Sequence, residues 1–358
     1  MTVGLDRLGY FETVASEGFA EWLAGQDISL VLARQAELVL VGRTPAGELR
    51  VDVIDGPPVG ALAADVGTLW MVTNFQVWRF EDGLEAGAVT DAGNDAFFLP
   101  QVGATVGGLQ VSDIGVRADG SPVLASHRFS CLATLADGLS FEPLWLPRWV
   151  TALVPEERSP ISGLAMHDGA PGFVTLLGCT DEPDRWRSER AAGGAIVDVG
   201  ADEVVAGGLS MPFHPRWHDG RLWFTQAGTG ELCVVEADNT VTVVAGLDTF
   251  VRGLDFVGPY AVVAGSGSRS VALIDGLPVG DRLIAADRRP EQGVFVIDTR
   301  TGAVAHRLTI EGTGREVPAM VVLSGLRRPT LIAPADQELQ TTVAYDRSWD
   351  PASARPLA

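Results

Sequence analysis

The sequence predicts an all-β fold, a six-bladed β-propeller, and two observations support this prediction. The first is an internal repeat of the form short strand, turn, second strand, which occurs six times along the chain. The second is the spacing of the repeats, because blades of about four short strands recur at intervals of this size. The repeats begin at Gly60, Asp113, Ser162, His214, Arg252 and Val317.

A glycine marks the turn between the first two predicted strands of each repeat. The second strand is rich in Val, Leu, Thr and Trp, which favour extended backbone. Two further strands follow in most repeats, as in GVFVIDTRTGAVAHRLTI, where a Thr-Gly pair stands at the turn. The turn glycines are Gly67, Gly120, Gly169, Gly220, Gly258 and Gly325.

The two ends of the chain are predicted to close the ring together. Residues 28–54 supply strands before the first repeat, whereas the last repeat lacks its outer strands. We therefore expect a propeller over residues 28–335, in which N-terminal strands complete the last blade. Residues 336–358 are expected to form a C-terminal strand or a frayed tail. Residues 1–27 are expected to form a helical extension, because apolar residues recur there at helical spacing, at Phe11, Val14, Phe19, Trp22 and Leu23.

Composition excludes several classes of function. All 26 basic residues are arginines, so Schiff-base chemistry and a P-loop lysine are ruled out. The formal net charge of −20 argues against nucleic acid and anionic membranes as partners, because both would be repelled. A neutral or cationic small molecule fits this acidic chain better.

The cysteines and the chain start point to the cytoplasm. Cys131, Cys179 and Cys233 are odd in number and widely spaced, which suits neither a disulfide framework nor a zinc motif. The chain start lacks the pattern of a signal peptide, and no apolar run has the ~18 residues that a membrane span needs. We interpret Cys131 as a small core residue rather than a nucleophile.

A candidate site follows from propeller geometry, because the innermost strands surround a central channel and open at one mouth. Asp113, His127, His214 and Arg252 are therefore predicted to converge on a small-molecule site. His127 or His214 would transfer protons, Asp113 would orient the reacting groups, and Arg216 or Arg252 would hold an anion. The other candidate substrate-binding residues are Asn74, Ser162, Trp217, Gln226 and Ser266.

A divalent metal in the channel is the alternative at this site. Calcium needs an oxygen-rich shell, and here the strand openings offer Asp113 and Asn74 with few other oxygen ligands. A zinc ion held by His127, His214 and Asp113 would lack the usual local ligand spacing. We therefore expect no cofactor, with a channel metal as the competing interpretation.

Six segments in this chain form a recognisable series, TNFQVWRFED, DIGV, FSCLATL, GLSMPFHPRW, GTGE and VRGLDFVGPYAVVAGS. In this order they resemble an uncharacterised bacterial β-propeller family, a domain of unknown function with the motif GLSMPxxPRW, over about residues 28–325. The resemblance implies a propeller fold. In some members of the family, the protein is found beside biosynthetic or group-transfer enzymes. The usual motif looks like GLSMPHSPRW, and its histidine corresponds to Phe213 here. The resemblance therefore gives more weight to Arg216 and Trp217 than to His214.

The favoured hypothesis is an enzyme that acts on a small metabolite by acid/base chemistry at the channel mouth. Its reaction would be of the hydrolase, lyase or cyclase type, in a bacterial biosynthetic pathway. One alternative is a non-catalytic propeller that holds a ligand or a protein partner. The other is a metal-dependent hydrolase resembling propeller lactonases.

Overall fold

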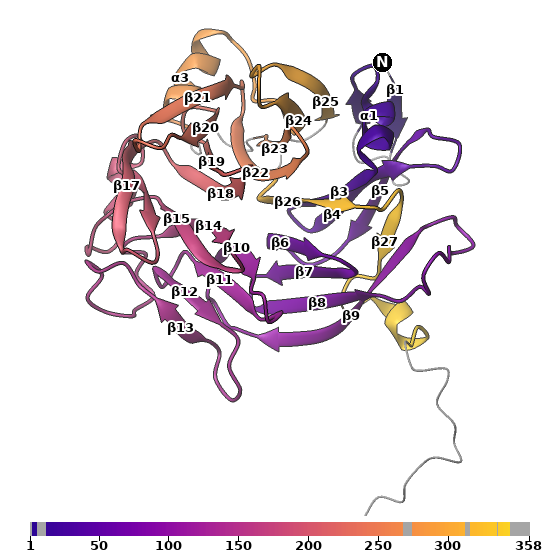
Figure 1. The fold of residues 1–358 in the computed structure, drawn as a ribbon, viewed down its shortest axis with the longest axis horizontal. Coiled ribbons are helices and arrows are strands. Elements are labelled where there is room, and N and C mark those ends of the chain that lie inside the picture. The colour runs from indigo at the N-terminus through magenta and orange to yellow at the C-terminus, as the bar shows by residue number, and fades with distance from the viewer. Residues whose placement is uncertain (1, 6–11, 268–273, 312–315, 335, 344–358) are drawn as a thin grey trace, which may run out of the picture.

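The computed structural model describes residues 2–5, 12–267, 274–311, 316–334 and 336–343. These residues form six small sheets arranged in a ring, so the predicted six-bladed β-propeller is confirmed (Figure 1). Within the described residues, no helix is long and apolar enough to cross a membrane.

The first three blades are formed by consecutive antiparallel strands. Blade 1 contains β6 (Val59–Asp65), β7 (Thr68–Thr73), β8 (Gln76–Asp82) and β9 (Ala96–Thr105). Blade 2 contains β10 (Val111–Val116), β11 (Pro122–Ser126), β12 (Cys131–Thr134) and β13 (Glu142–Trp145). Blade 3 contains β14 (Ile161–His167), β15 (Ala170–Leu176), β16 (Gly194–Asp198) and β17 (Glu203–Leu209).

The remaining blades complete the ring. Blade 4 contains β18 (Pro212–His218), β19 (Arg221–Gln226), β20 (Glu231–Val235) and β21 (Val241–Gly246). Blade 5 begins with β22 (Phe250–Val257), β23 (Tyr260–Ser266), β24 (Gly293–Asp298) and β25 (Val304–Glu311). Blade 6 contains β26 (Ala319–Ser324), β3 (Ile28–Arg34), β4 (Glu37–Arg43) and β5 (Leu49–Asp55). The first strand named in each blade lies innermost, where it contacts the first strands of the neighbouring blades.

Blade 6 confirms the predicted closure, because its inner strand β26 comes from the C-terminal part and its other strands from the N-terminal part. Alternating residues of β3 explain why this strand fits the gap. Leu30 and Leu32 pack into the apolar core shared with blade 5, whereas Val31 and Ala33 pack into the core shared with blade 1. The closing strand is thus buried on both faces.

The N-terminal extension is partly strand, which corrects the helical expectation for its first half. Val14 lies in β2 (Glu12–Ala15), which pairs with β25 and with β1 (Thr2–Leu5). The helix α1 (Phe19–Gln26) begins only after Gly18, whose φ of 79° does not suit a helix. Phe19, Trp22 and Leu23 are buried in α1 as expected. Phe11 and residues 344–358 of the predicted C-terminal strand or frayed tail over 336–358 lie outside the described residues, whereas its first part contains a short 3₁₀ helix.

The six turn glycines all adopt positive φ, between 50° and 81°, as tight turns require. One of the associated strand predictions is wrong. The chain after Gly325 does not pair with β26, because β3 occupies that position. It forms β27 (Pro329–Leu331), which pairs in parallel with β9 of blade 1, and then a short 3₁₀ helix, η2 (Gln337–Gln340).

Five of the six inner strands carry a register shift at the same level, just after their first residues. The shifts lie between Val59 and Ala61, Val111 and Asp113, Ile161 and Gly163, Phe213 and Arg216, and Val251 and Leu254. Such bulges re-aim side chains and often occur next to functional sites. Most of the repeat-opening residues singled out by sequence lie in or beside these bulges.

Candidate functional site

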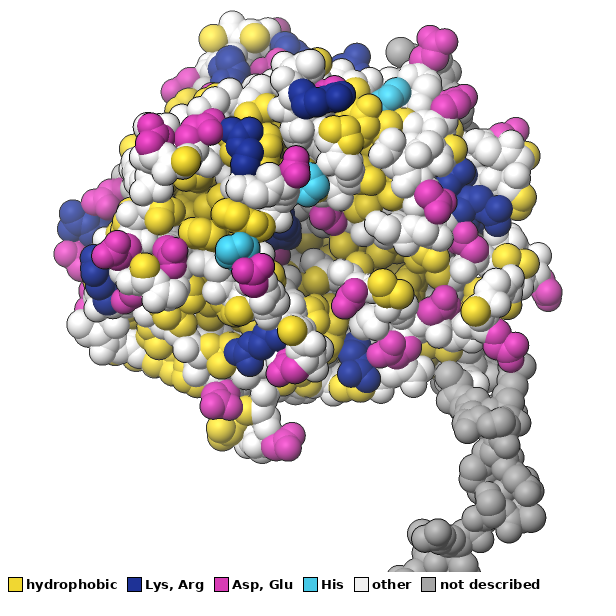
Figure 2. All heavy atoms as spheres, viewed as in Figure 1, with side chains coloured by type: hydrophobic (Ala, Val, Ile, Leu, Met, Phe, Trp, Pro, Cys, Tyr) yellow, Lys and Arg dark blue, Asp and Glu magenta, His cyan; other side chains and the backbone are white. Residues whose placement is uncertain are grey.

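A cavity of ≈ 330 Å³ lies at the end of the channel where the inner strands finish. Figure 2 shows the molecule from one side, and this face is hollowed near its centre. Most of the residues that line the cavity have aliphatic side chains, and three of the lining residues are charged. The lining includes Leu62, Asp65, Ile114, Leu164, Met166, Arg216, Trp217, Asp255 and Met320.

The cavity floor is organised by an ion pair between Asp113 of β10 and Arg216 of β18. The guanidinium donates from Nη1 to Oδ2 at 2.7 Å and from Nη2 to Oδ1 at 3.2 Å. Nη1 also donates to the carbonyl oxygens of Leu164 and Pro215. Burial opposes ionisation of Asp113, which is 1% exposed, but Arg216, His214 and a hydrogen bond from the backbone nitrogen of Leu164 together outweigh burial and lower the pKa of the carboxyl. Asp113 therefore orients Arg216, rather than a histidine.

His214 lies in the bulge of β18, beside this ion pair. Its φ is 43°, it is 2% exposed, and neither ring nitrogen has a hydrogen-bond partner of good geometry among the described residues. Burial lowers the pKa of His214 to about 3, and the charges of Arg216 and Arg252 lower it as well, whereas Asp113 and a hydrogen bond with the Arg252 backbone raise it only in part. The imidazole is therefore neutral at pH 7.

The backbone of His214 is packed against the neighbouring blade at Gly163. A Cβ on Gly163 would lie 2.5 Å from the backbone nitrogen of His214 and 2.4 Å from Cδ of Pro215. No side chain fits there, so glycine is required for the two inner strands to approach. Gly163 thereby sets the position of the imidazole in the channel.

Asp255 of β22 is a second carboxyl in the channel; it is half-buried and lies in the cavity wall. Its two oxygens accept hydrogen bonds from the backbone nitrogens of Phe256 and Val322, each at 2.8 Å. Burial raises the pKa of Asp255, and the attraction of Arg216 offsets this only in part. In the described part of the chain, no ion pair is formed by Asp255. The surroundings of the two channel carboxyls thus shift their pKa values in opposite directions, downwards for Asp113 and upwards for Asp255.

Arg252 lies nearer the end where the inner strands begin. Its guanidinium stacks over the ring of Phe213 at 4.6 Å, and Nη1 is 3.7 Å from the carboxylate of Glu316. Nε of Arg252 has no hydrogen-bond partner within the described residues. Burial lowers the pKa of Arg252. An apolar cluster that includes Phe213, Phe250 and Trp186 packs at this end of blades 4 and 5.

His127 does not join Asp113 and His214. Its Nε2 lies 3.7 Å from Glu157, and its ring meets that of Trp186 edge-on at 5.5 Å. Arg187 also pairs with Glu157, at 2.5 Å, and stacks over Trp186 at 4.5 Å. The sequence-predicted site is therefore divided into a channel cluster and a separate His127 cluster, because the loops after β13 and β15 supply partners to His127.

The other predicted binding residues have structural contacts. Ser162 donates to the carbonyl oxygen of Pro212 at 2.6 Å, and Ser266 accepts from the backbone nitrogen of Val317 at 2.9 Å. Both hydroxyls thus join one blade to the next, a role that the sequence interpretation missed. Gln226 accepts from the nitrogen of Ser210, and Asn74 is an exposed turn residue.

Trp217 is at the rim of the cavity, where it stacks in parallel on Phe173 with a ring separation of 5.7 Å. Its exposed fraction of 37% leaves one part of the indole accessible. Asp255 was not identified from sequence. The signal that could have found it is a carboxylate within an apolar strand, in Leu254-Asp255-Phe256.

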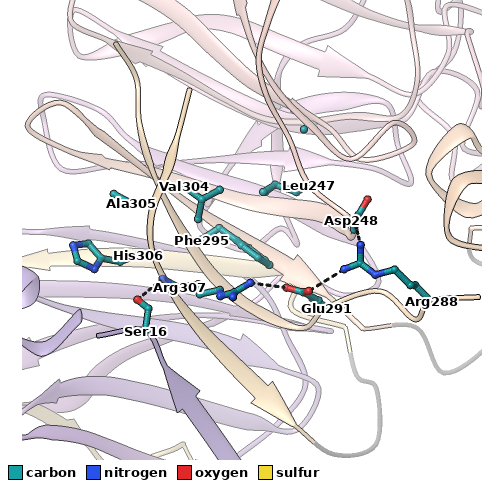
Figure 3. A pocket seen from close by; sticks show the side chains of 11 residues that line it. Ser16, Leu247, Asp248, Arg288, Glu291, Phe295, Val304, Ala305, His306 and Arg307 are labelled. Atoms are coloured by element: carbon teal, nitrogen blue, oxygen red, sulfur yellow. Dashed lines mark hydrogen bonds and ion pairs between the residues drawn. The ribbon is translucent and has the colours of Figure 1, made fainter. Parts of the chain in front are cut away.

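A larger cavity of ≈ 500 Å³ lies between blades 4 and 5, but its charged groups are paired with one another. Figure 3 shows Arg288 between Asp248 and Glu291, with Arg307 directed at the other side of Glu291. This arrangement joins two blades and leaves the channel as the better candidate site. In the described residues, no three His, Cys, Asp or Glu side chains lie together in a way that could hold a metal ion.

Cys131 is a fully buried core residue, as predicted, and burial raises the pKa of its thiol to about 12. It cannot supply a thiolate near neutral pH.

Comparison with known proteins assigns the family. A model of a domain of unknown function, DUF4915, matches residues 17–332. The chain belongs to the DUF4915 family. None of the curated proteins matches this DUF4915 chain significantly by sequence.

Three solved structures are similar to this DUF4915 chain, and the first of them shares its fold. A nidogen/laminin complex structure is 11% identical, covers 83% of this chain and 99% of its own, and has a TM-score of 0.51. A protein of unknown function from Bacteroides caccae is 11% identical over 83% of this chain and 99% of its own, with a TM-score of 0.49. A virginiamycin B lyase from Staphylococcus aureus is 13% identical over 66% of this chain and 76% of its own, with a TM-score of 0.37. At these identities the likeness concerns the fold alone.

Proposed function

We propose that this chain is an enzyme that acts on a small metabolite by acid/base chemistry in the central channel. The observation that carries the proposal is His214, a buried neutral imidazole without a hydrogen-bond partner of good geometry among the described residues, which lies next to the Asp113–Arg216 ion pair. Arg216 of that pair lines the cavity. A buried polar group without a partner is costly, and it is expected where a ligand completes the hydrogen bonding. The proposed reaction is of the hydrolase, lyase or cyclase type, in a cytoplasmic bacterial biosynthetic pathway.

The channel residues have distinct proposed roles. His214 accepts a proton from the substrate or returns one, because a neutral imidazole has both an acceptor and a donor nitrogen. Arg216 orients the substrate in the cavity by hydrogen bonding, since Asp113 neutralises the charge of the guanidinium and holds it in a fixed orientation. Asp255 binds a polar group of the substrate in the cavity wall.

His214→Asn tests this proposal, because asparagine tolerates positive φ better than most residues and so suits the bulge. Native mass spectrometry of the full chain as purified would first search for a small organic molecule bound to the protein. Turnover of that molecule, or of a hit from a metabolite screen, is then measured for the wild type and the variant. We expect His214→Asn to lower kcat about 100-fold or more, as for loss of a general acid or base.

His218→Asn is the matched control, since His218 lies on the same strand and bonds Gly258 outside the cavity. The control should keep wild-type turnover. Equal turnover in His214→Asn and the wild type would contradict the proposal. A ligand that binds in the channel but is never converted would instead support a non-catalytic binding propeller.

A further inference from the structure

The cavity has more negative than positive charge. Arg216 is the guanidinium in its lining, and Asp113 behind it already neutralises that charge at 2.7 Å. Nη1 of Arg216 is occupied by Asp113 and by two backbone carbonyl oxygens. Asp255 and Asp65 also line the cavity. A carboxylate ligand would therefore face two carboxyl groups and a guanidinium that is already paired.

Asp255 is the decisive group. Asp255 is half-buried, and a carboxylate that is partly removed from water is stabilised by a counter-charge. The backbone nitrogens of Phe256 and Val322 satisfy one lone pair on each oxygen, and no described residue forms an ion pair with this carboxyl. Because Asp255 lies in the cavity wall, a ligand bound in the cavity can supply the counter-charge.

We infer that the channel binds a primary amine with an apolar body, and that the ammonium group pairs with Asp255. This inference rests on the proposed function of the channel and names the substrate class. The ammonium group has three donors and suits a carboxylate whose oxygens keep free lone pairs.

The remaining cavity wall suits an apolar body. Met166, Met320 and Leu164 line it, and their side chains adapt to or pack on hydrocarbon. Trp217 at the rim offers an indole face that favours a cation or an aromatic ring. The volume of ≈ 330 Å³ equals that of about 11 water molecules, which fits an amine the size of an arylalkylamine.

Isothermal titration calorimetry on the full chain at pH 7 tests this inference with three probes of similar size. Phenethylamine is cationic, 3-phenylpropanol is neutral and 3-phenylpropionate is anionic. We expect phenethylamine to bind most tightly and 3-phenylpropionate most weakly. Asp255→Asn should weaken phenethylamine binding about 30-fold, as expected for loss of one partner of a buried charge pair. It should change the binding of 3-phenylpropanol little.

Asp137→Asn is the matched control, because it removes one negative charge from an exposed position outside the cavity. This variant should bind phenethylamine as the wild type does. If Asp255→Asn does not fold, Trp217→Leu provides a second test, since its indole lies at the rim. We expect that variant to weaken phenethylamine binding about threefold through loss of a cation–π contact.

The possible outcomes separate this inference from the proposed function. Tighter binding of 3-phenylpropionate than of phenethylamine would overturn the amine assignment, and so would unchanged amine binding in both Asp255→Asn and Trp217→Leu. If none of the three probes binds, the inference is equally overturned. The proposed function fails separately, when His214→Asn retains the turnover of whichever metabolite the wild type converts.

Discussion

The low pKa of His214 predicts a specific loss of stability in acid. In the folded chain the pKa of His214 is lowered to about 3 from the ordinary value of 6.5, chiefly by burial. Between pH 6.5 and about pH 3, His214 therefore binds a proton in the unfolded chain but not in the folded chain. Stability is unaffected by this group above pH 6.5 and falls as the pH decreases from there towards 3. Linkage gives a loss of about 2 kcal/mol between pH 8 and pH 5 from His214 alone.

His214→Asn removes the titrating group and should remove this component. The free energy of unfolding is measured by urea denaturation of the wild type and the variant at pH 8 and at pH 5. We expect the wild type to lose about 2 kcal/mol more than the variant over this interval. His218→Asn should behave as the wild type does, because His218 bonds a backbone carbonyl at a partly exposed position. An equal loss in the wild type and His214→Asn would refute the reasoning that a buried neutral imidazole occupies the channel.

Three further predictions concern the same fold. Asp113→Asn should lower the free energy of unfolding by about 1 to 3 kcal/mol, because the half-buried guanidinium of Arg216 loses its charged partner; urea denaturation measures this, and a loss near zero would contradict it. Gly163→Ala should lower the free energy of unfolding by about 1 to 3 kcal/mol, because the added Cβ forces the His214 backbone away. Urea denaturation at pH 8 and pH 5 measures this loss, and an unchanged free energy of unfolding at both pH values would contradict the prediction. A maleimide should label only Cys179 in the native chain, and slowly near neutral pH, because burial raises the pKa of this exposed residue's thiol to about 11; mass spectrometry of Cys179→Ser should find no labelling on the same timescale, since the other two thiols are buried.

The repeat pattern was sufficient to predict the blades, because the turn glycines need positive φ and the strand residues alternate between two apolar cores. The predicted second strand after Gly325 was wrong, since the N-terminal strand β3 occupies the place beside β26. The apolar residues from Phe11 to Leu23 recur at helical spacing, and this pattern predicts a helix that includes Val14. In the structure Val14 lies in β2, and the helix α1 begins only after Gly18. The spacing of apolar residues along the chain does not indicate which strand a segment pairs with in the folded protein.

The residues of the site were predictable to a lesser degree. Alignment of the repeats placed Asp113, His214 and Arg216 on inner strands, and the structure brings them together. The same alignment placed His127 with them, whereas Glu157 and Trp186 from separate loops hold it elsewhere.

The sequence by itself determined the number of blades, the closure of the ring by both chain ends and the acidic character of the molecule, because these follow from repeats and composition. Only the tertiary structure decided which charges neutralise one another. Asp113 and Arg216 are 103 residues apart, and the inner-strand bulges bring their side chains into contact while Asp255 remains without a counter-ion among the described residues. Charge pairing depends on distances of a few ångströms between separate blades, and no local pattern in the chain encodes those distances.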